Sequence, residues 1–338
     1  MNANGDNVVE SLGFERTLSE LRLAYESSHP ASRTAMQKAE TSMPGGNTRS
    51  VLHADPFPLV ITAGEGAHVV DLDGHRYLDC VGEFSAGLYG HRNPVIRQAI
   101  VDALATGLTL GGVGLREGDF AQLVCSRFAS VDKVRFCNSG TEANLLALLT
   151  ARAVTGRNRF VVFDGAYHGG VLNFPSGKDN PLNAPFSWQV LPFNDTAAIT
   201  KYMQENGDDV AAVIVEPILG AGGNIPGTHD FLRTLRATAT SAGALLIFDE
   251  VKTSRCGPGG VQQLVDVMPD LTTLGKYLGG GLTLGAFGGR EEIMQRFNPA
   301  KAGSFSHAGT FNNNVLSMAA GYAGLSEVYT VDRARQFH

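Results

Sequence analysis

The stretch at residues 244–251, Ala-Leu-Leu-Ile-Phe-Asp-Glu-Val, decides the fold class of this chain. Its apolar run has the length of a strand and ends at two acids, which is typical of a buried strand whose carboxyl end leaves the core. Similar apolar runs alternate with helical stretches along most of the chain. The predicted strands lie at 134–137, 159–163, 210–215, 271–274 and 284–287, and the clearest helices at 141–154 and 230–242. This alternation predicts an α/β fold, a mostly parallel sheet covered by helices on both faces.

Sheets of this kind bind ligands beyond the carboxyl ends of their strands, so the residues that follow each strand matter most. Ser139, Gly140 and Thr141 follow the first of these strands and open a helix. Their N–H and hydroxyl groups suit a phosphate at a helix N-terminus, and they also suit an ordinary helix cap. Tyr167 and His168 stand near glycines after the next strand, where they form either a stacking surface for a planar ligand or part of a polar loop.

Three further strand ends carry charged residues. Glu216 closes a buried strand and therefore needs a partner, for which an arginine is one candidate. Asp249 and Glu250 close the strand quoted above; either one of them holds a ring nitrogen protonated, or both are capping acids. Lys276 follows the next strand in a neutral, glycine-rich stretch. That setting favours a buried lysine, which can act as a Schiff-base nucleophile, over a solvated one.

Composition narrows the class of protein. The 338 residues carry a formal net charge of −6, which argues against nucleic acid as the main partner. The four cysteines form no C-x-x-C pair, so we expect reduced thiols in a cytoplasmic protein and no metal site. Apolar runs stay shorter than a membrane span, so no membrane partner is expected.

The N-terminal part of the sequence is organised differently. Residues 17–40 predict a helix that breaks near Pro30, and Asp73-Gly74 predicts a hairpin turn between two short strands. The expected domains are an N-terminal region at 1–90, a large cofactor-binding α/β domain at 91–310, and the start of a further domain at 311–338.

A phosphate cup, a stacking aromatic, a ring-nitrogen acid and a Schiff-base lysine in one chain predict a pyridoxal phosphate site. These residues resemble the class III aminotransferases of fold type I, whose motifs follow here in family order. They are Asp73-Gly74, Gly90-His91, Ser139-Gly140-Thr141-Glu142-Ala143, Tyr167-His168-Gly169, Glu216-Pro217, Asp249-Glu250-Val251, Lys276 and Gly309-Thr310-Phe311.

The resemblance implies a role for each residue. Lys276 would form the Schiff base with the cofactor and move the substrate proton, and Asp249 would pair with the pyridine nitrogen. Val251 and Tyr167 would pack on the two ring faces. Thr310 would reach the phosphate of a neighbouring subunit, which implies a homodimer. The other residues that the resemblance assigns to the cofactor site are Ser139, Gly140, Thr141, His168 and Glu216.

Residues 43–50, Met-Pro-Gly-Gly-Asn-Thr-Arg-Ser, resemble two branches of the family, the β-amino-acid aminotransferases and the glutamate-1-semialdehyde aminomutases. In the first branch an arginine that matches Arg49 binds the substrate carboxylate, a task that suits its planar, bidentate donors. The alternative for Arg49 is a surface salt bridge.

The expected reaction is amino transfer between an amino acid, with a β-amino acid as one candidate, and a keto acid. Intramolecular amino transfer and cofactor binding without activity are the alternatives. Family members continue well beyond residue 338, so the segment 311–338 is expected to begin an incomplete C-terminal domain.

Overall fold

The computed structural model describes residues 4–178 and 180–337. The chain forms two compact units, which are described separately. The first contains the residues up to Gly82 together with 90–92, and the second contains 83–89 and everything from Asn93 onward. The domain boundaries expected at residues 90 and 310 stay predictions.

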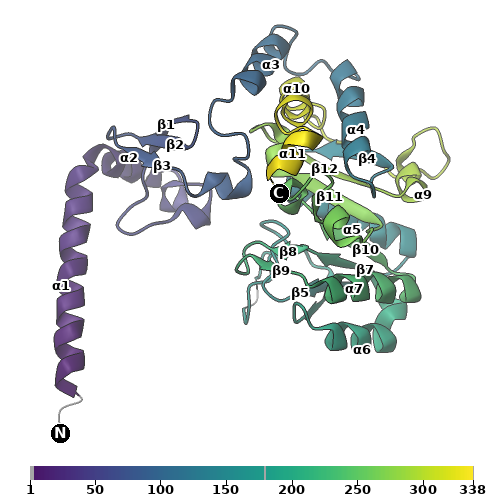
Figure 1. The fold of residues 1–338 in the computed structure, drawn as a ribbon, viewed down its shortest axis with the longest axis horizontal. Helices are drawn as coiled ribbons and strands as arrows, with labels where there is room; N and C mark the ends of the chain where they lie inside the picture. Colours follow the sequence, from purple (N-terminus) through teal and green to yellow (C-terminus); the bar gives the residue numbers. More distant parts are fainter. Residues whose placement is uncertain (1–3, 179, 338) are drawn as a thin grey trace. The chain divides into compact units, whose positions relative to one another are not determined.

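Two helices and a three-stranded sheet make up the first unit (Figure 1). The helix break predicted near Pro30 is confirmed, because α1 (Asn4–Ser28) ends there and α2 (Pro30–Glu40) begins with the proline at its first position. Proline suits that position since its missing N–H has no partner in a first turn. The helix starts much earlier than the predicted residue 17. The strands are β1 (Ile61–Glu65), β2 (His68–Asp71) and β3 (Arg76–Leu78), all antiparallel.

Asp71 and Asp73 organise the predicted hairpin between β2 and β3. The buried Asp71 carboxylate accepts hydrogen bonds from the backbone N–H and the ring of His75 at 2.8 and 3.0 Å and from the Tyr77 hydroxyl at 2.9 Å. Burial alone would raise the pKa of Asp71, but these bonds outweigh it and lower the pKa to about 2. Asp73 accepts from the backbone N–H groups of Ala31 and Ser32 at 2.7 and 3.0 Å, so the hairpin caps α2.

The second unit is built on a seven-stranded sheet, as the alternating pattern predicted. Its spatial order is β4 (Lys133–Cys137), β12 (Gly285–Gly289), β11 (Leu271–Gly275), β10 (Leu245–Asp249), β7 (Val210–Val215), β5 (Arg159–Phe163) and β6 (Ser187–Leu191). Only β12 runs antiparallel to its neighbours, so the sheet is mostly parallel. Gly275 pairs with Gly285, and the chain returns from β11 to β12 at the same edge of the sheet.

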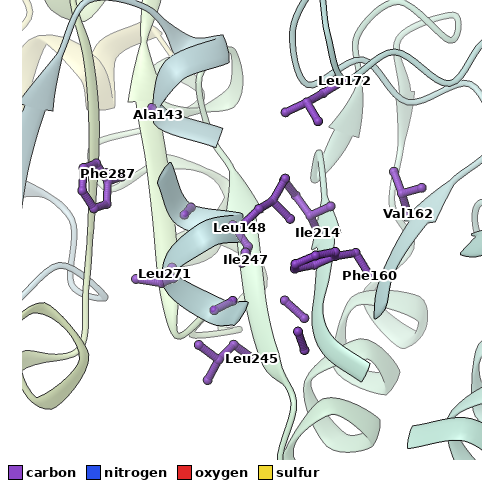
Figure 2. Close-up of a cluster of buried hydrophobic side chains, with 14 of the residues drawn as sticks. Ala143, Leu148, Phe160, Val162, Leu172, Ile214, Leu245, Ile247, Leu271 and Phe287 are labelled. Atoms are coloured by element: carbon purple, nitrogen blue, oxygen red, sulfur yellow. The ribbon is translucent and has the colours of Figure 1, made fainter. Parts of the chain in front are cut away.

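Alternate side chains of the strands feed two hydrophobic cores, one on each face of the sheet. Leu245 and Ile247 of β10 join the core under α5 (Gly140–Thr155), as Figure 2 shows together with Leu148 of that helix. Leu246 and Phe248 join the opposite core, which α7 (His229–Ala242) and α6 (Thr196–Asn206) cover. These continuous apolar runs are therefore buried on both faces, the pattern expected of central parallel strands.

Shorter helices complete the second unit (Figure 1). They are α3 (Pro94–Leu104), α4 (Leu115–Arg127), α8 (Gly260–Val265), α9 (Glu291–Met294), α10 (Val315–Ala323) and α11 (Val331–Phe337). A third core joins α4 and α10 to the segment that follows β11. None of the helices among the described residues is long and apolar enough to span a membrane.

Candidate active site

The carboxyl ends of three neighbouring strands bring the predicted charged residues to one edge of the sheet. Glu216 follows β7, Asp249 ends β10 and Lys276 follows β11, and these strands lie side by side in that order. Asp249 pairs in register with Thr273 of β11. The topology therefore gathers residues that lie far apart in the sequence, as the rule for open α/β sheets leads one to expect.

The N-terminus of α5 forms one side of this site. The Ser139 hydroxyl accepts a hydrogen bond from the Glu142 N–H at 3.1 Å, so Ser139 caps the helix. The backbone N–H groups of Gly140 and Thr141 donate to no acceptor among the residues that the structure describes. Two such groups at the start of a long helix are prepared for an anion, which matches the predicted phosphate cup. The capping role and the phosphate role of Ser139 are thus compatible.

Glycines make this cup possible because other groups pack directly on them. A β-carbon at Gly140 would lie 2.7 Å from Cγ1 of Val251, and one at Gly275 would lie 3.4 Å from the same atom. A β-carbon at Gly169 would collide with the Thr141 side chain at 2.2 Å, and Gly169 has a φ of +130°, which disfavours any other residue. Val251, for which the resemblance implies a ring contact, therefore lies beside the helix start.

Asp249 is held by a buried set of donors. His168 Nδ1 lies 2.8 Å from Asp249 Oδ2, Asn144 Nδ2 donates to the same oxygen at 2.8 Å, and the Val251 N–H donates to Oδ1 at 3.0 Å. His168, Asn144 and Asp249 are all buried. His168 thus contacts the proposed ring-nitrogen acid, whereas the adjacent Tyr167 is 43% exposed and free to stack.

Glu216 serves the loops around the site. Its carboxylate accepts from the N–H groups of Tyr167 at 2.9 Å and Gly220 at 3.0 Å, and these backbone groups replace the arginine partner considered from the sequence. Burial raises the pKa of Glu216, with a smaller opposing effect from His168 and a further rise from Asp249. Glu216 therefore fixes the Tyr167 backbone beside the candidate site.

The second acid of the pair, Glu250, lies away from the site. Its fully buried carboxylate accepts from the Thr253 hydroxyl at 2.8 Å and from the N–H groups of Val261 and Gln262 at 3.0 and 2.8 Å. These bonds tie the loop after β10 to α8. The structure thus separates two roles that the sequence left open, since Asp249 alone joins the network around His168.

Lys276 has the properties of a reactive amine. It adopts a left-handed φ of 54°, which is unfavourable for a residue with a side chain and is common at functional positions. Burial lowers its pKa, and nearby Lys252 and Arg255 lower it further, while Asp249 and Glu216 oppose the change. Within the described parts of the chain its amine has neither a hydrogen bond nor an ion pair.

Thr310 and Arg49 are the two remaining site residues that the resemblance implied. Thr310 is exposed in the loop before α10, and Asn312 of that loop accepts from Asn138 Nδ2 at 3.0 Å at the end of β4. Arg49 belongs to the first unit, where it is exposed and its N–H donates to Asn47 Oδ1 at 2.8 Å. The roles predicted for both residues stay predictions.

Two residues in the network were missed from the sequence, Asn144 and Thr273. Thr273 Oγ1 donates to Asn144 Oδ1 at 2.6 Å, behind Asp249. Asn144 does carry a signal, because it directly precedes the apolar run at 145–149 of a predicted helix, where a buried amide needs partners. Thr273 has no comparable signal, since threonine is ordinary in a strand.

These residues fit pyridoxal phosphate. The free N–H groups at the start of α5 suit its phosphate, the uncommitted Lys276 amine suits its aldehyde, and the anchored Asp249 carboxylate suits its ring nitrogen. Because Gly140 has no side chain, Val251 can pack against the start of α5, next to these N–H groups. The pattern of donors therefore agrees with the cofactor expected from the sequence.

Comparison with known proteins identifies the family of the chain. The family model of class III aminotransferases matches residues 50–336. The chain is 49% identical over 321 residues to the β-phenylalanine transaminase of Variovorax paradoxus, which covers 95% of this chain and 74% of that enzyme. It is 41% identical over 314 residues to a glutamate-1-semialdehyde 2,1-aminomutase of Staphylococcus saprophyticus, covering 88% and 73%.

Solved structures give the same result. The β-phenylalanine aminotransferase from Variovorax paradoxus superimposes with a TM-score of 0.92 over 95% of this chain and 74% of that one, at 49% identity. A transaminase with pyridoxal phosphate bound superimposes with a TM-score of 0.82 at 31% identity, covering 88% and 73%. The chain therefore belongs to the class III aminotransferases, pyridoxal-phosphate-dependent enzymes that move an amino group between an amino acid and a keto acid.

Proposed function

We propose that this aminotransferase takes a β-amino acid as its amino donor. The observation that carries the proposal is the 49% identity to an enzyme named for β-phenylalanine, against 41% to the aminomutase. Residues 43–50 resemble both branches, and within them Arg49 matches the carboxylate-binding arginine of the β-amino-acid branch. An aryl-substituted β-amino acid such as β-phenylalanine is the first substrate to test.

Each residue at the carboxyl ends of the strands has its own role in the reaction. Pyridoxal phosphate, when bound, supplies the electron sink that makes the substrate carbon acidic. Lys276 Nζ moves the proton, and its lowered pKa keeps more of the amine neutral and able to accept it. Asp249 holds a proton on the ring nitrogen, and Val251 and Tyr167 confine the ring. Ser139, Gly140 and Thr141 bind the phosphate, while His168 and Glu216 hold the acid and the aromatic in place.

Arg49 would bind the carboxylate of the donor. A guanidinium offers two parallel N–H donors to a carboxylate, whereas lysine offers a point charge, so the two should not be interchangeable here. Arg49→Lys should raise KM for the β-amino acid much more than it lowers kcat. An equal KM would assign Arg49 to a structural role.

We also infer a homodimer in which Thr310 serves the partner's phosphate. Apolar side chains gather near this loop: Val113 is 95% exposed and Phe311 is 59% exposed. Asn313 Nδ2 donates to the Gly112 carbonyl at 3.1 Å, which places the two segments side by side. Exposed apolar groups of this kind favour association. We also propose a cytoplasmic location for the protein, because its four cysteines are free thiols.

The test is amino-group transfer by the purified protein loaded with pyridoxal phosphate. β-Phenylalanine and α-phenylalanine are each offered with pyruvate or 2-oxoglutarate, and the alanine or glutamate formed is measured. We expect turnover with the β-isomer that depends on the keto acid and is abolished in Lys276→Ala.

Three other outcomes would overturn the proposal. Conversion of glutamate-1-semialdehyde without any added keto acid would identify an aminomutase, the function that the Staphylococcus relative suggests. Retention of the cofactor without turnover of any amine would identify a binding protein. Preference for the α-isomer would leave an aminotransferase of different specificity.

A further inference from the structure

We propose that Asn144 and Thr273 act as a positioning pair that fixes the carboxylate of Asp249 for the cofactor's ring nitrogen. Neither residue touches the proposed position of the reacting atoms. Both act through Asp249, from α5 and β11 respectively. The inference rests on the role proposed for Asp249.

The hydrogen bonds of Asn144 give its amide one orientation. Oδ1 accepts from Thr273 Oγ1 at 2.6 Å, while Nδ2 donates to the His168 carbonyl at 2.9 Å and to Asp249 Oδ2 at 2.8 Å. A reversed amide would place its oxygen against a carbonyl and a carboxylate, which are both acceptors. The two acceptors at Nδ2 therefore set the orientation of the amide, and the Thr273 hydroxyl completes it by donating to the buried Oδ1.

This arrangement holds the carboxylate from several directions. Asp249 Oδ2 receives Asn144 Nδ2 and lies 2.8 Å from His168 Nδ1. Its Oδ1 receives the Val251 N–H at 3.0 Å and lies 3.5 Å from Thr273 Oγ1. Rotation of the carboxylate would break these charge-assisted bonds together. The lone pairs of Oδ1 therefore keep one orientation, in which they can accept a hydrogen bond from the ring nitrogen of the cofactor.

Because Asn144 and Thr273 are buried, a hydrogen bond lost between them cannot be replaced. Asn144 is 1% exposed and Thr273 is fully buried, so water cannot replace a lost donor. A buried acceptor left unpaired carries the cost of its desolvation. Removing the Thr273 hydroxyl should therefore release Asn144 and, through it, loosen Asp249.

The neighbouring residue on β11 supplies a matched control. Thr272 is equally buried, but it faces the opposite side of the strand, where its hydroxyl lies 2.7 Å from Ser130 Oγ and within reach of Gln262. Thr272→Val and Thr273→Val thus remove the same hydroxyl from adjacent buried positions of one strand. Only the second touches the Asp249 network.

The experiment compares Thr273→Val, Thr272→Val, Thr273→Ser, Asn144→Ala and Asp249→Asn as purified proteins. The dissociation constant of pyridoxal phosphate is measured by titration of each apoenzyme, and the absorbance spectrum of the bound cofactor is followed against pH. Circular dichroism and chemical denaturation report folding. The valine variants keep the side-chain shape, so the test survives if Asn144→Ala fails to fold.

We expect Thr273→Val to weaken cofactor binding about two- to tenfold relative to Thr272→Val, the range for a hydrogen bond between uncharged groups. It should also shift the pH dependence of the spectrum in the same direction as Asp249→Asn, and Thr273→Ser should restore both. Equal cofactor affinity and equal spectra in the two valine variants would overturn the inference.

The controls separate this result from the proposed function. Cofactor binding and spectra require no knowledge of the substrate, so failure to accept a β-amino acid leaves this test intact. If Asp249→Asn itself changes neither the cofactor affinity nor the spectrum, the role proposed for Asp249 is wrong, and so is the role proposed for Asn144 and Thr273. If Asp249→Asn has its effect and Thr273→Val does not, only the positioning pair is wrong.

Discussion

The charge of Lys252 lies close enough to Lys276 to lower the pKa of the Lys276 amine. Burial is the larger cause of that lowering, and Asp249 and Glu216 act against it. Lys252 is half-buried, donates to Asn224 Oδ1, and passes within 3.3 Å of the position of a β-carbon on Gly220. A second lysine on the loop after β10 thus adjusts the acidity of the first.

Replacing Lys252 by glutamine should raise the pKa of Lys276. A larger share of the amine is then protonated at a given pH, so uptake of pyridoxal phosphate by the apoenzyme should require more alkaline buffer. We expect its pH–rate profile to move toward higher pH. The exposed Lys201→Gln variant is the control, and identical profiles for both variants would contradict the assigned effect of Lys252.

Gly140→Ala tests the cup at the start of α5. The added methyl would meet both methyl groups of Val251, at 2.7 and 2.9 Å, and displacing them should cost about 1–3 kcal/mol and weaken cofactor binding at least several-fold. Gly118→Ala is the matched control, because Gly118 is an exposed residue of α4 with open space around it. That change should stabilise the protein by about 0.5–1 kcal/mol. Denaturant titration and cofactor titration measure both effects.

Asp71→Asn should destabilise the N-terminal unit at neutral pH by about 2–4 kcal/mol, because buried donors lose a charged acceptor. The folded-state pKa of Asp71, about 2, lies below the usual unfolded value of about 3.9. Its contribution is therefore complete above pH 4 and is lost as the pH falls toward 2. The gap between wild type and variant in urea titrations should close over that range. A gap that stays constant down to pH 2 would argue against the ionised Asp71.

Phe311→Glu should weaken the proposed dimer. A buried, unpaired carboxylate is unfavourable at an apolar contact, so the dimer dissociation constant should rise at least tenfold. Leu182→Glu is the control, since Leu182 is 72% exposed in the loop before β6. Sedimentation velocity over a range of concentrations distinguishes the two variants. A wild-type chain that stays monomeric would remove the role proposed for Thr310.

The sequence predicted most of the central sheet. The apolar runs at 159–163 and 210–215 are strands with those same bounds, because central strands buried on both faces are apolar throughout. Strand β6 was missed because it is not buried on both faces. It lies at the edge of the sheet, pairs only with β5 and exposes part of its side chains, so no continuous apolar run marks it.

The candidate site was predictable where one residue type carries the chemistry. Lys276 follows a strand in a neutral, glycine-rich stretch, and Asp249 ends a strand beside Glu250. The sequence therefore pointed to both positions but left the choice between the two acids open. The contact of Asn144 with Asp249 joins positions 105 residues apart, and its contact with Thr273 joins positions 129 apart. Such pairs depend on packing between α5, β10 and β11, which no local pattern encodes. The partner of Glu216 was hidden for the same reason, since backbone N–H groups are present at every residue.

The pairing of Gly275 with Gly285 has a consequence for how this site can evolve. The return at 276–284 is anchored at both ends by adjacent strands, so Lys276 samples few conformations and closing the loop costs little entropy. Insertions into long surface loops are usually tolerated. An added or deleted residue in this return would instead rotate the lysine relative to Asp249. The length of 276–284 should therefore vary less among functional descendants than the composition of its side chains.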